Sequence, residues 1–215
     1  MLLNIYERLF ALYGPQHWWP GDSPFEVMVG AILTQSAAWQ NVEKAIRNLK
    51  TAGTLSPQAL SQLPVEEIAR LIYPSGYYNA KARKLKALVE WLGEACGDDI
   101  GKLSGIETDE LRRQLLAVHG VGPETADSIL LYALGKPVFV IDAYTRRIMF
   151  RLGLVGEKTS YEKLQKLFMD NLQPDVQSFN EYHALLVRLG KTVCRKQPLC
   201  RECPLFDICP SNEAR

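Results

Sequence analysis

The sequence lacks an excess of charge, any long hydrophobic run and any internal repeat. Its 25 Lys and Arg are nearly balanced by 24 Asp and Glu, which gives the 215 residues a formal net charge of +1. Overall basicity therefore does not indicate a nucleic-acid partner, and such a function would have to rest on local basic patches. No apolar run approaches the length of a transmembrane helix, and charged residues interrupt the N-terminus too early for a signal peptide. We therefore expect a cytoplasmic protein with no membrane partner.

Signals for β-strands are equally scarce. No segment with the two-residue period of a strand is longer than residues 137–141, whereas apolar residues at helical spacing recur along the chain. The hydrophobic fraction of 47% is enough for one large core or two modest ones. These patterns predict an all-α fold.

A glycine-rich turn between two predicted helices lies near the middle of the chain. Gly120 and Gly122 end one apolar helical pattern, Pro123 stands where the next helix would begin, and Pro137 would end that helix. Glycines in such a turn let backbone N–H groups point outward beside a helix N-terminus, which favours an anion such as a phosphate. An ordinary corner between two helices explains the same pattern.

Asp142 follows the second glycine by 20 residues, directly before a helix predicted to begin at Ala143. An Asp in this position is typical of a helix N-cap. A capping carboxylate is also rigidly aimed, so a structural role and a catalytic role are compatible.

Two motifs carry a family resemblance. His-Gly-Val-Gly-Pro-Glu-Thr-Ala at 119–126 and Val-Ile-Asp-Ala-Tyr-Thr-Arg-Arg at 140–147 resemble the helix-hairpin-helix and Gly/Pro–Asp signature of the endonuclease III-like DNA glycosylases. The resemblance implies a six-helix domain over residues 22–136, and a second helical domain with an iron–sulfur cluster loop over 1–21 and 137–215. It also implies that a monomer binds double-stranded DNA containing a damaged base, in the bacterial or archaeal nucleoid.

The resemblance implies that Asp142 is the catalytic residue. The sequence departs from the bifunctional members of the family at Glu124. Bifunctional members of the family carry a lysine at the Glu124 position, whose amine forms a Schiff base with the sugar and leads to strand cleavage. A carboxylate cannot form a Schiff base, and no lysine lies between Val118 and Gly135. We therefore expect a monofunctional glycosylase of base excision repair, with Glu124 in its base pocket. An acid favoured by the helix dipole is the simpler explanation of Glu124, and both can hold.

Three tryptophans are candidates for the same pocket. Trp18 and Trp19 lie in a proline-flanked loop, and Trp39 opens a helix after Ile-Leu-Thr-Gln. We expect one ring of the adjacent pair to pack in the core, and core packing would explain all three. The resemblance, which is closest to the 3-methyladenine DNA glycosylase branch, brings these segments beside the extruded nucleotide. Aromatic rings would there favour a positively charged alkylated purine such as 3-methyladenine by roughly 0.5–2 kcal/mol per face.

Basic residues crowd two predicted helices. The residues are Lys81, Arg83, Lys84 and Lys86 in one helix and Arg146, Arg147 and Arg151 in the other. In the first of these helices the cations crowd the N-terminal turns, where they oppose the helix dipole, so an anion outside the protein would stabilise them; a solvated surface is the alternative. By resemblance, Gln35 fills the gap left by the flipped nucleotide and Tyr77 is a strand-separating wedge. The predicted DNA-binding residues are Gln35, Tyr77, Lys81, Gly120, Gly122 and Arg146.

Four of the five cysteines cluster near the C-terminus. Cys194, Cys200, Cys203 and Cys209 lie within 16 residues, and a cytoplasmic chain would use them for a metal centre in preference to disulfides. Spacing alone leaves zinc and iron–sulfur open, since only Cys200 and Cys203 form a short pair. The resemblance implies a [4Fe–4S] cluster, although the first gap is one residue shorter than in endonuclease III. The fifth, Cys96, is expected in the core.

Four other functions fit parts of the pattern, among them a structural iron–sulfur or zinc protein with no DNA partner. One is a glycosylase for mismatched, deaminated or oxidised bases, such as thymine or uracil opposite guanine, or adenine opposite oxidised guanine. Another is an endonuclease III-type lyase. A non-catalytic DNA-binding module would keep the glycines and basic helices but would not need Asp142.

Overall fold

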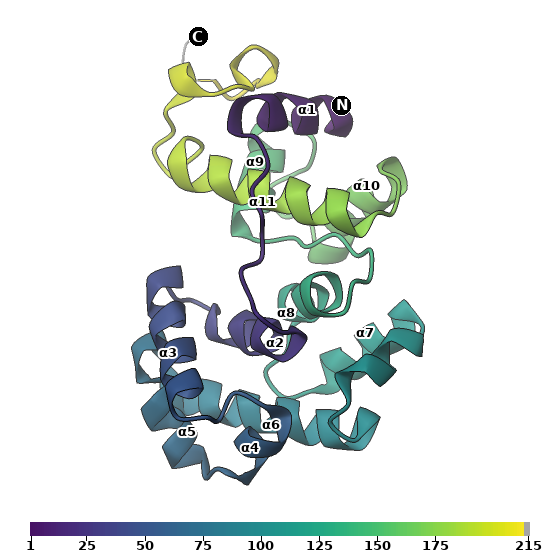
Figure 1. The fold of residues 1–215 in the computed structure, drawn as a ribbon. Helices are drawn as coiled ribbons and strands as arrows, with labels where there is room; N and C mark the ends of the chain where they lie inside the picture. The colour runs from purple at the N-terminus through teal and green to yellow at the C-terminus, as the bar shows by residue number, and fades with distance from the viewer. Residues whose placement is uncertain (213–215) are drawn as a thin grey trace. The chain divides into compact units, whose positions relative to one another are not determined.

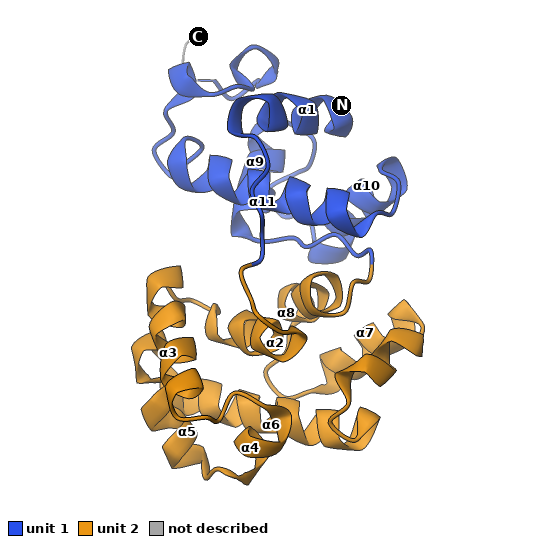
Figure 2. Ribbon diagram, in the orientation of Figure 1, with its two compact units in different colours: residues 1–19, 137–215 blue, residues 20–136 orange. Residues whose placement is uncertain are grey.

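The computed structural model describes residues 1–212, and within them the chain forms helices and no strand (Figure 1). The all-α prediction is therefore confirmed. The chain divides into two compact units (Figure 2). We call residues 20–136 the hairpin unit, and residues 1–19 with 137–215 the cysteine unit. None of the described helices is both long and apolar enough to cross a membrane.

The hairpin unit is built around α2. Ser23 caps this helix, since its hydroxyl accepts a hydrogen bond from the Glu26 N–H at 3.2 Å, and Pro24 occupies the first turn. Nine of its ten residues are buried, as expected for a helix that is apolar on all sides. It contacts α3, α6, α8 and η3. The elements of the unit are α2 Pro24–Leu33, α3 Trp39–Thr51, α4 Pro57–Gln62, α5 Val65–Leu71, η1 Tyr73–Ser75, α6 Tyr78–Cys96, η2 Ile100–Gly105, α7 Thr108–Ala117, α8 Pro123–Ser128 and η3 Ile129–Ala133.

The helix after the glycines is shorter than its sequence pattern predicts. The α-helical part ends at Ser128, and Ile129–Ala133 continues as one wide π-helical turn before Gly135 at φ +61°. The turn still buries Ile129, Leu130 and Leu131. It contacts α2, so this departure keeps the predicted apolar face in the core.

The cysteine unit is built around α11, which contacts α1 and α9. Its core contains an aromatic cluster in which the Phe139 and Phe168 rings stack with centroids 3.9 Å apart. The Tyr182 hydroxyl donates to the Leu2 carbonyl at 2.8 Å and so fixes α1 on α11. Residues 137–141 have no strand partner, and Phe139 anchors them in this cluster. The elements are α1 Leu2–Tyr13, α9 Ala143–Arg151, α10 Tyr161–Asn171, α11 Val176–Thr192, η4 Cys200–Glu202 and η5 Phe206–Ile208.

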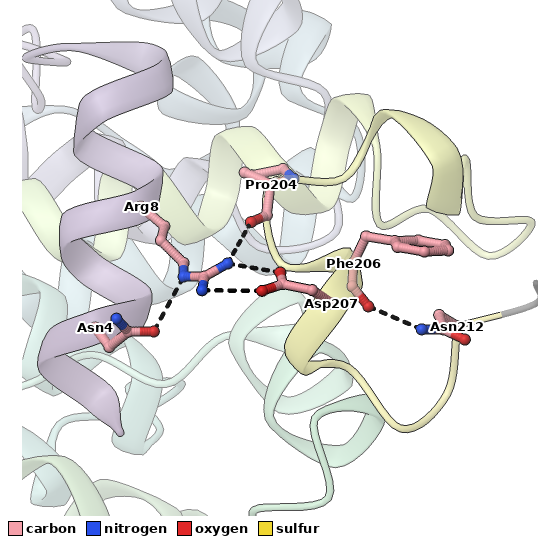
Figure 3. Close-up of polar contacts among 6 residues, drawn as sticks. All are labelled: Asn4, Arg8, Pro204, Phe206, Asp207 and Asn212. Carbon is pink, nitrogen blue, oxygen red and sulfur yellow. Dashed lines mark hydrogen bonds and ion pairs between the residues drawn. The ribbon is translucent and has the colours of Figure 1, made fainter.

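An ion pair joins α1 to the C-terminal loop (Figure 3). The Arg8 guanidinium donates to both carboxylate oxygens of Asp207, at 2.6 and 3.0 Å, and to the Pro204 carbonyl at 3.4 Å. A two-point Arg–carboxylate contact fixes orientation as well as distance. The loop that carries the cysteines is therefore held from the N-terminal helix.

Candidate active site

Asp142 is the N-cap of α9, as predicted. Its Oδ1 accepts a hydrogen bond from the Thr145 N–H at 2.7 Å, and its side chain is 12% exposed. The carboxylate therefore lies at the positive end of a helix dipole with one oxygen fixed. Its second oxygen, Oδ2, lies 3.8 Å from Nε2 of His183 on α11.

His183 is the residue near Asp142 that sequence reasoning missed. It is 5% exposed. Burial lowers the pKa of its imidazole, the Asp142 charge partly opposes this shift, and Lys191 adds to it. The imidazole is therefore neutral at pH 7. In the sequence, His183 is one residue among the apolar positions of a helix, and no local pattern connects position 183 with position 142.

The two hairpin glycines differ in what they require. Gly120 has φ +81°, and a Cβ on it would lie 2.4 Å from Cγ of Lys84. Gly122 has φ −96° and ψ 179°, an extended conformation open to any residue, and no atom lies within 4 Å of its ideal Cβ. The backbone thus requires glycine at 120 but not at 122. Gly122 is exposed, with open space in front of it.

Gln35 is bonded to the hairpin. Its Nε2 donates to the Gly120 carbonyl at 3.1 Å and to the Thr125 hydroxyl at 2.9 Å, and its Oε1 accepts a hydrogen bond from the Lys84 ammonium. The Gln35 side chain therefore connects three parts of the hairpin unit, namely the segment after α2, the glycine hairpin and α6. Gln35 would have to break these two donated bonds to fill a gap in a DNA duplex.

The predicted phosphate contact of Lys81 is wrong. Lys81 is 2% exposed, and its ammonium donates to the carbonyls of Leu33 at 2.8 Å and Ser75 at 2.7 Å. Burial lowers its pKa to about 8, with a smaller contribution from Lys84. The Lys81 ammonium caps the C-terminal carbonyls of α2 and η1. The buried side chain is therefore not accessible to a phosphate. Lys84 is the half-buried lysine of this helix that lies against the hairpin.

The second basic cluster is largely engaged with backbone carbonyls. Arg146 is half-buried and donates to the Thr159 carbonyl. Arg147 donates to the carbonyls of Cys194 at 2.9 Å and Gly190 at 2.8 Å. Arg151 donates to two further carbonyls of the C-terminal loop. Arg147 and Arg151 thus anchor the cysteine loop on α9, and Arg146, the predicted DNA contact of this helix, is bonded to the Thr159 carbonyl.

Tyr77 is the aromatic residue that α6 presents most openly. It is 75% exposed and caps the helix with φ 46°, a left-handed conformation that a bulky residue rarely adopts. Tyr73, four residues earlier, is also exposed, and its ring lies tilted against that of Tyr78 with centroids 4.8 Å apart. An aromatic ring held away from the protein in this way suits insertion between bases.

Trp18, Trp19 and Trp39 are all half-buried. We expected one ring of the adjacent pair in the core, and neither belongs to the set of buried core residues. The two rings meet edge to face with centroids 5.7 Å apart. The Lys191 ammonium lies 5.5 Å from the centroid of Trp18. In the hairpin unit, the Trp39 indole N–H donates to Glu43 at 2.7 Å, and Glu124 is exposed in the first turn of α8.

The four clustered cysteines line one cavity. Its lining also includes Val193, Pro198, Phe206 and Arg151. The Arg151 guanidinium lies 3.3 Å from the Cys194 sulfur. Burial raises the pKa of the Cys203 and Cys209 thiols, so a metal that binds here would displace their protons. Within residues 1–212 no three His, Cys, Asp or Glu side chains converge on the position of a single metal ion. Cys96 is buried in α6, as predicted.

Comparison with known proteins adds independent information. Residues 29–174 match the model of the family described as HhH-GPD superfamily base excision DNA repair protein. The chain is 44% identical over 214 residues to "Putative DNA repair glycosylase MJ1434" of Methanocaldococcus jannaschii, covering 99% of this chain and 97% of that protein. It is 32% identical over 190 residues to endonuclease III of Thermotoga maritima, covering 86% and 82%. The solved structure of H. pylori 3-methyladenine DNA glycosylase (MagIII) bound to 1,N6-ethenoadenine has a TM-score of 0.76 at 26% identity, covering 88% of this chain and 97% of that one.

Proposed function

The chain belongs to the HhH-GPD superfamily of base excision DNA repair proteins, and on that premise we propose that it is a monofunctional DNA glycosylase. It would hydrolyse the N-glycosidic bond of one flipped base and leave the strand intact. The observation that carries the proposal is the exposed Glu124 in the first turn of α8, with no lysine from residue 118 to 135. Membership of this family supports DNA glycosylase activity. The absence of strand cleavage is the additional claim, and it rests on Glu124.

Asp142 supplies the chemistry in this proposal. An enzyme cannot reach the bond inside a duplex, so it acts on an extruded nucleotide. As the base leaves, positive charge develops on the deoxyribose. A carboxylate fixed in a partly dry position stabilises that charge and can orient the attacking water. The hydrogen bond to Thr145 N–H and the low exposure of Asp142 support this role.

The hairpin unit would supply the duplex contacts. We propose that the DNA backbone approaches Gly122, where the space in front of the Cα is open. Tyr77 would separate the strands, and Gln35 would enter the gap after leaving Gly120 and Thr125. Lys84 takes the place of Lys81 as the basic residue of α6 beside the hairpin.

We further propose that the substrate is an alkylated purine such as 3-methyladenine. A methylated purine carries a positive ring, which gains roughly 0.5–2 kcal/mol over a neutral base against each aromatic face. Lys191 already puts a positive charge against one face of Trp18, which disfavours a second cation there. Of the adjacent pair, Trp19 is therefore the proposed stacking residue. Trp39 is proposed as a stacking residue on separate grounds, because its half-buried ring opens α3. The 26% identity to a 3-methyladenine DNA glycosylase supports a DNA glycosylase, and the choice of an alkylated purine rests on the aromatic residues.

A four-thiolate metal centre is the occupant that we propose for the cysteine cavity. Cys194, Cys200, Cys203 and Cys209 all line it, and we propose that they hold a [4Fe–4S] cluster, with zinc as the alternative. When bound, the cluster would cross-link the loop that Arg8, Arg147 and Arg151 hold from outside.

One experiment tests the substrate. Duplexes containing 3-methyladenine, uracil or thymine opposite guanine, or adenine opposite oxidised guanine are incubated with the enzyme, and the released base is identified. We expect release of the methylated purine. Release of thymine or uracil from guanine mispairs, without the methylated purine, would overturn the argument from aromatic stacking in favour of a mismatch glycosylase.

A further inference from the structure

The second oxygen of the Asp142 carboxylate faces a buried imidazole. Oδ1 is held by the Thr145 N–H at 2.7 Å, while Oδ2 lies 3.8 Å from His183 Nε2. A separation of 3.8 Å is longer than a hydrogen bond, and Nε2 of His183 is buried where it faces the carboxylate. Contacts in catalytic sites are often long without substrate and shorten in the substrate complex.

The packing of two helices fixes the distance between these residues. Asp142 caps α9 and His183 lies on α11. The helices approach so closely that a Cβ on Gly190 would lie 2.5 Å from Cδ1 of Tyr144. Arg147 of α9 also donates to the Gly190 carbonyl at 2.8 Å. The close packing of α9 on α11 therefore places His183 opposite Asp142, and no loop sets the distance between the two side chains.

A neutral imidazole suits this position better than a cation. The carboxylate has to keep its negative charge to stabilise a developing positive charge on the sugar. A charged partner would cancel part of that charge, whereas a neutral N–H can orient the carboxylate without neutralising it. Two charged groups act on His183: Asp142 on α9 favours the protonated ring, and Lys191 on α11 disfavours it together with burial.

We propose that His183 is a positioning residue, whose Nε2–H orients the Asp142 carboxylate for base excision. The inference rests on the proposed glycosylase function. Thr145 and His183 would then hold one oxygen each, so that the carboxylate plane is fixed before the nucleotide arrives. The negative charge beside Nε2 favours the tautomer that carries its hydrogen there.

The test compares His183→Leu, which keeps bulk but has no donor, with His183→Gln, whose amide nitrogen can reach the same region. The rate of base release is measured with excess enzyme, alongside the Kd for a duplex with an abasic-site analogue and the melting temperature. We expect His183→Leu to be slower by about 10- to 100-fold at unchanged Kd, and His183→Gln to recover most of the rate. A His183→Leu enzyme as fast as wild type overturns the proposal. Equal loss in both variants, with a matching loss of stability, assigns His183 to the core alone and also overturns it.

A titration followed by NMR provides a readout that does not depend on activity. The chain has three histidines, and the exposed His17 and His119 provide reference signals. Asp142→Asn should lower the pKa of His183, because the charge that favours protonation is removed. An unchanged His183 titration overturns the coupling. Wild type and Asp142→Asn are also run in the base-release assay: a wild-type enzyme that releases no base refutes the proposed function, whereas an active wild type with an unaffected His183→Leu variant refutes this inference alone.

Discussion

Replacing each hairpin glycine by alanine should separate folding from DNA binding. At Gly120 the φ of +81° costs a non-glycine residue about 1–2 kcal/mol. The added Cβ also displaces the Lys84 side chain, since it would lie 2.4 Å from Lys84 Cγ, and so disturbs the Lys84 bond to Gln35. We expect Gly120→Ala to lower the melting temperature by roughly 2–8 °C.

Gly122→Ala should behave in the opposite way. The backbone there is extended and the space around the ideal Cβ is open, so stability should stay within about 0.5 kcal/mol of wild type. If the DNA backbone approaches at this point, the methyl group prevents close contact with a phosphate. The loss of one hydrogen bond to a charged group, about 1.5–3 kcal/mol, corresponds to roughly a 10- to 100-fold weaker Kd.

The assay is fluorescence anisotropy with a labelled duplex that contains an abasic-site analogue, at one fixed salt concentration. Gly105→Ala is a matched control, because Gly105 is also exposed with nothing within 4 Å of its ideal Cβ. It should keep both stability and affinity. A Gly122→Ala protein that binds DNA as tightly as wild type would refute the role of the hairpin in backbone contact.

Three further predictions follow from the remaining sites. The purified protein should be brown, absorb broadly near about 400 nm and contain about four irons per chain; a colourless protein with one zinc would contradict the cluster but not the fold. Trp39→Ala should slow release of 3-methyladenine about tenfold or more while binding of the abasic-site duplex changes little, with Trp18→Ala as the milder comparison; equal losses in excision and binding would argue for a packing role. Burial lowers the pKa of Lys81 from 10.5 to about 8, so between these values the unfolded chain binds more protons than the folded one. The free energy of unfolding should therefore rise with pH in this window. Denaturant titrations of wild type and Lys81→Met should show the rise in wild type only, and parallel curves would refute it.

Local patterns predicted the parts of the fold that local physics controls. The Asp142 cap is confirmed because an N-cap involves only residues three apart in the chain. The all-α fold is confirmed because helical periodicity recurs over most segments. The π-helical turn at Ile129–Ala133 was missed because its apolar residues have the same spacing as an ordinary helix.

Long-range contacts account for what the sequence could not predict. The basic first turns of α6 do not reveal that Lys81 points inward to the Leu33 and Ser75 carbonyls, while Lys84 lies against the hairpin. His183 meets Asp142 only because α9 and α11 pack closely. Both facts depend on which helices become neighbours, and a single sequence does not contain that information in any local window.

The central claim is hydrolysis by Asp142 without strand cleavage. An end-labelled duplex carrying 3-methyladenine is incubated with wild type, Asp142→Asn and Glu124→Lys, and each sample is resolved with and without hot alkali, and after borohydride. We predict that wild type yields cleaved strand only after alkali and no covalent adduct, and that Asp142→Asn is slower by on the order of a hundredfold or more at similar DNA affinity. A wild-type enzyme that nicks the strand unaided and is trapped by borohydride, or an Asp142→Asn enzyme as fast as wild type, would contradict the account.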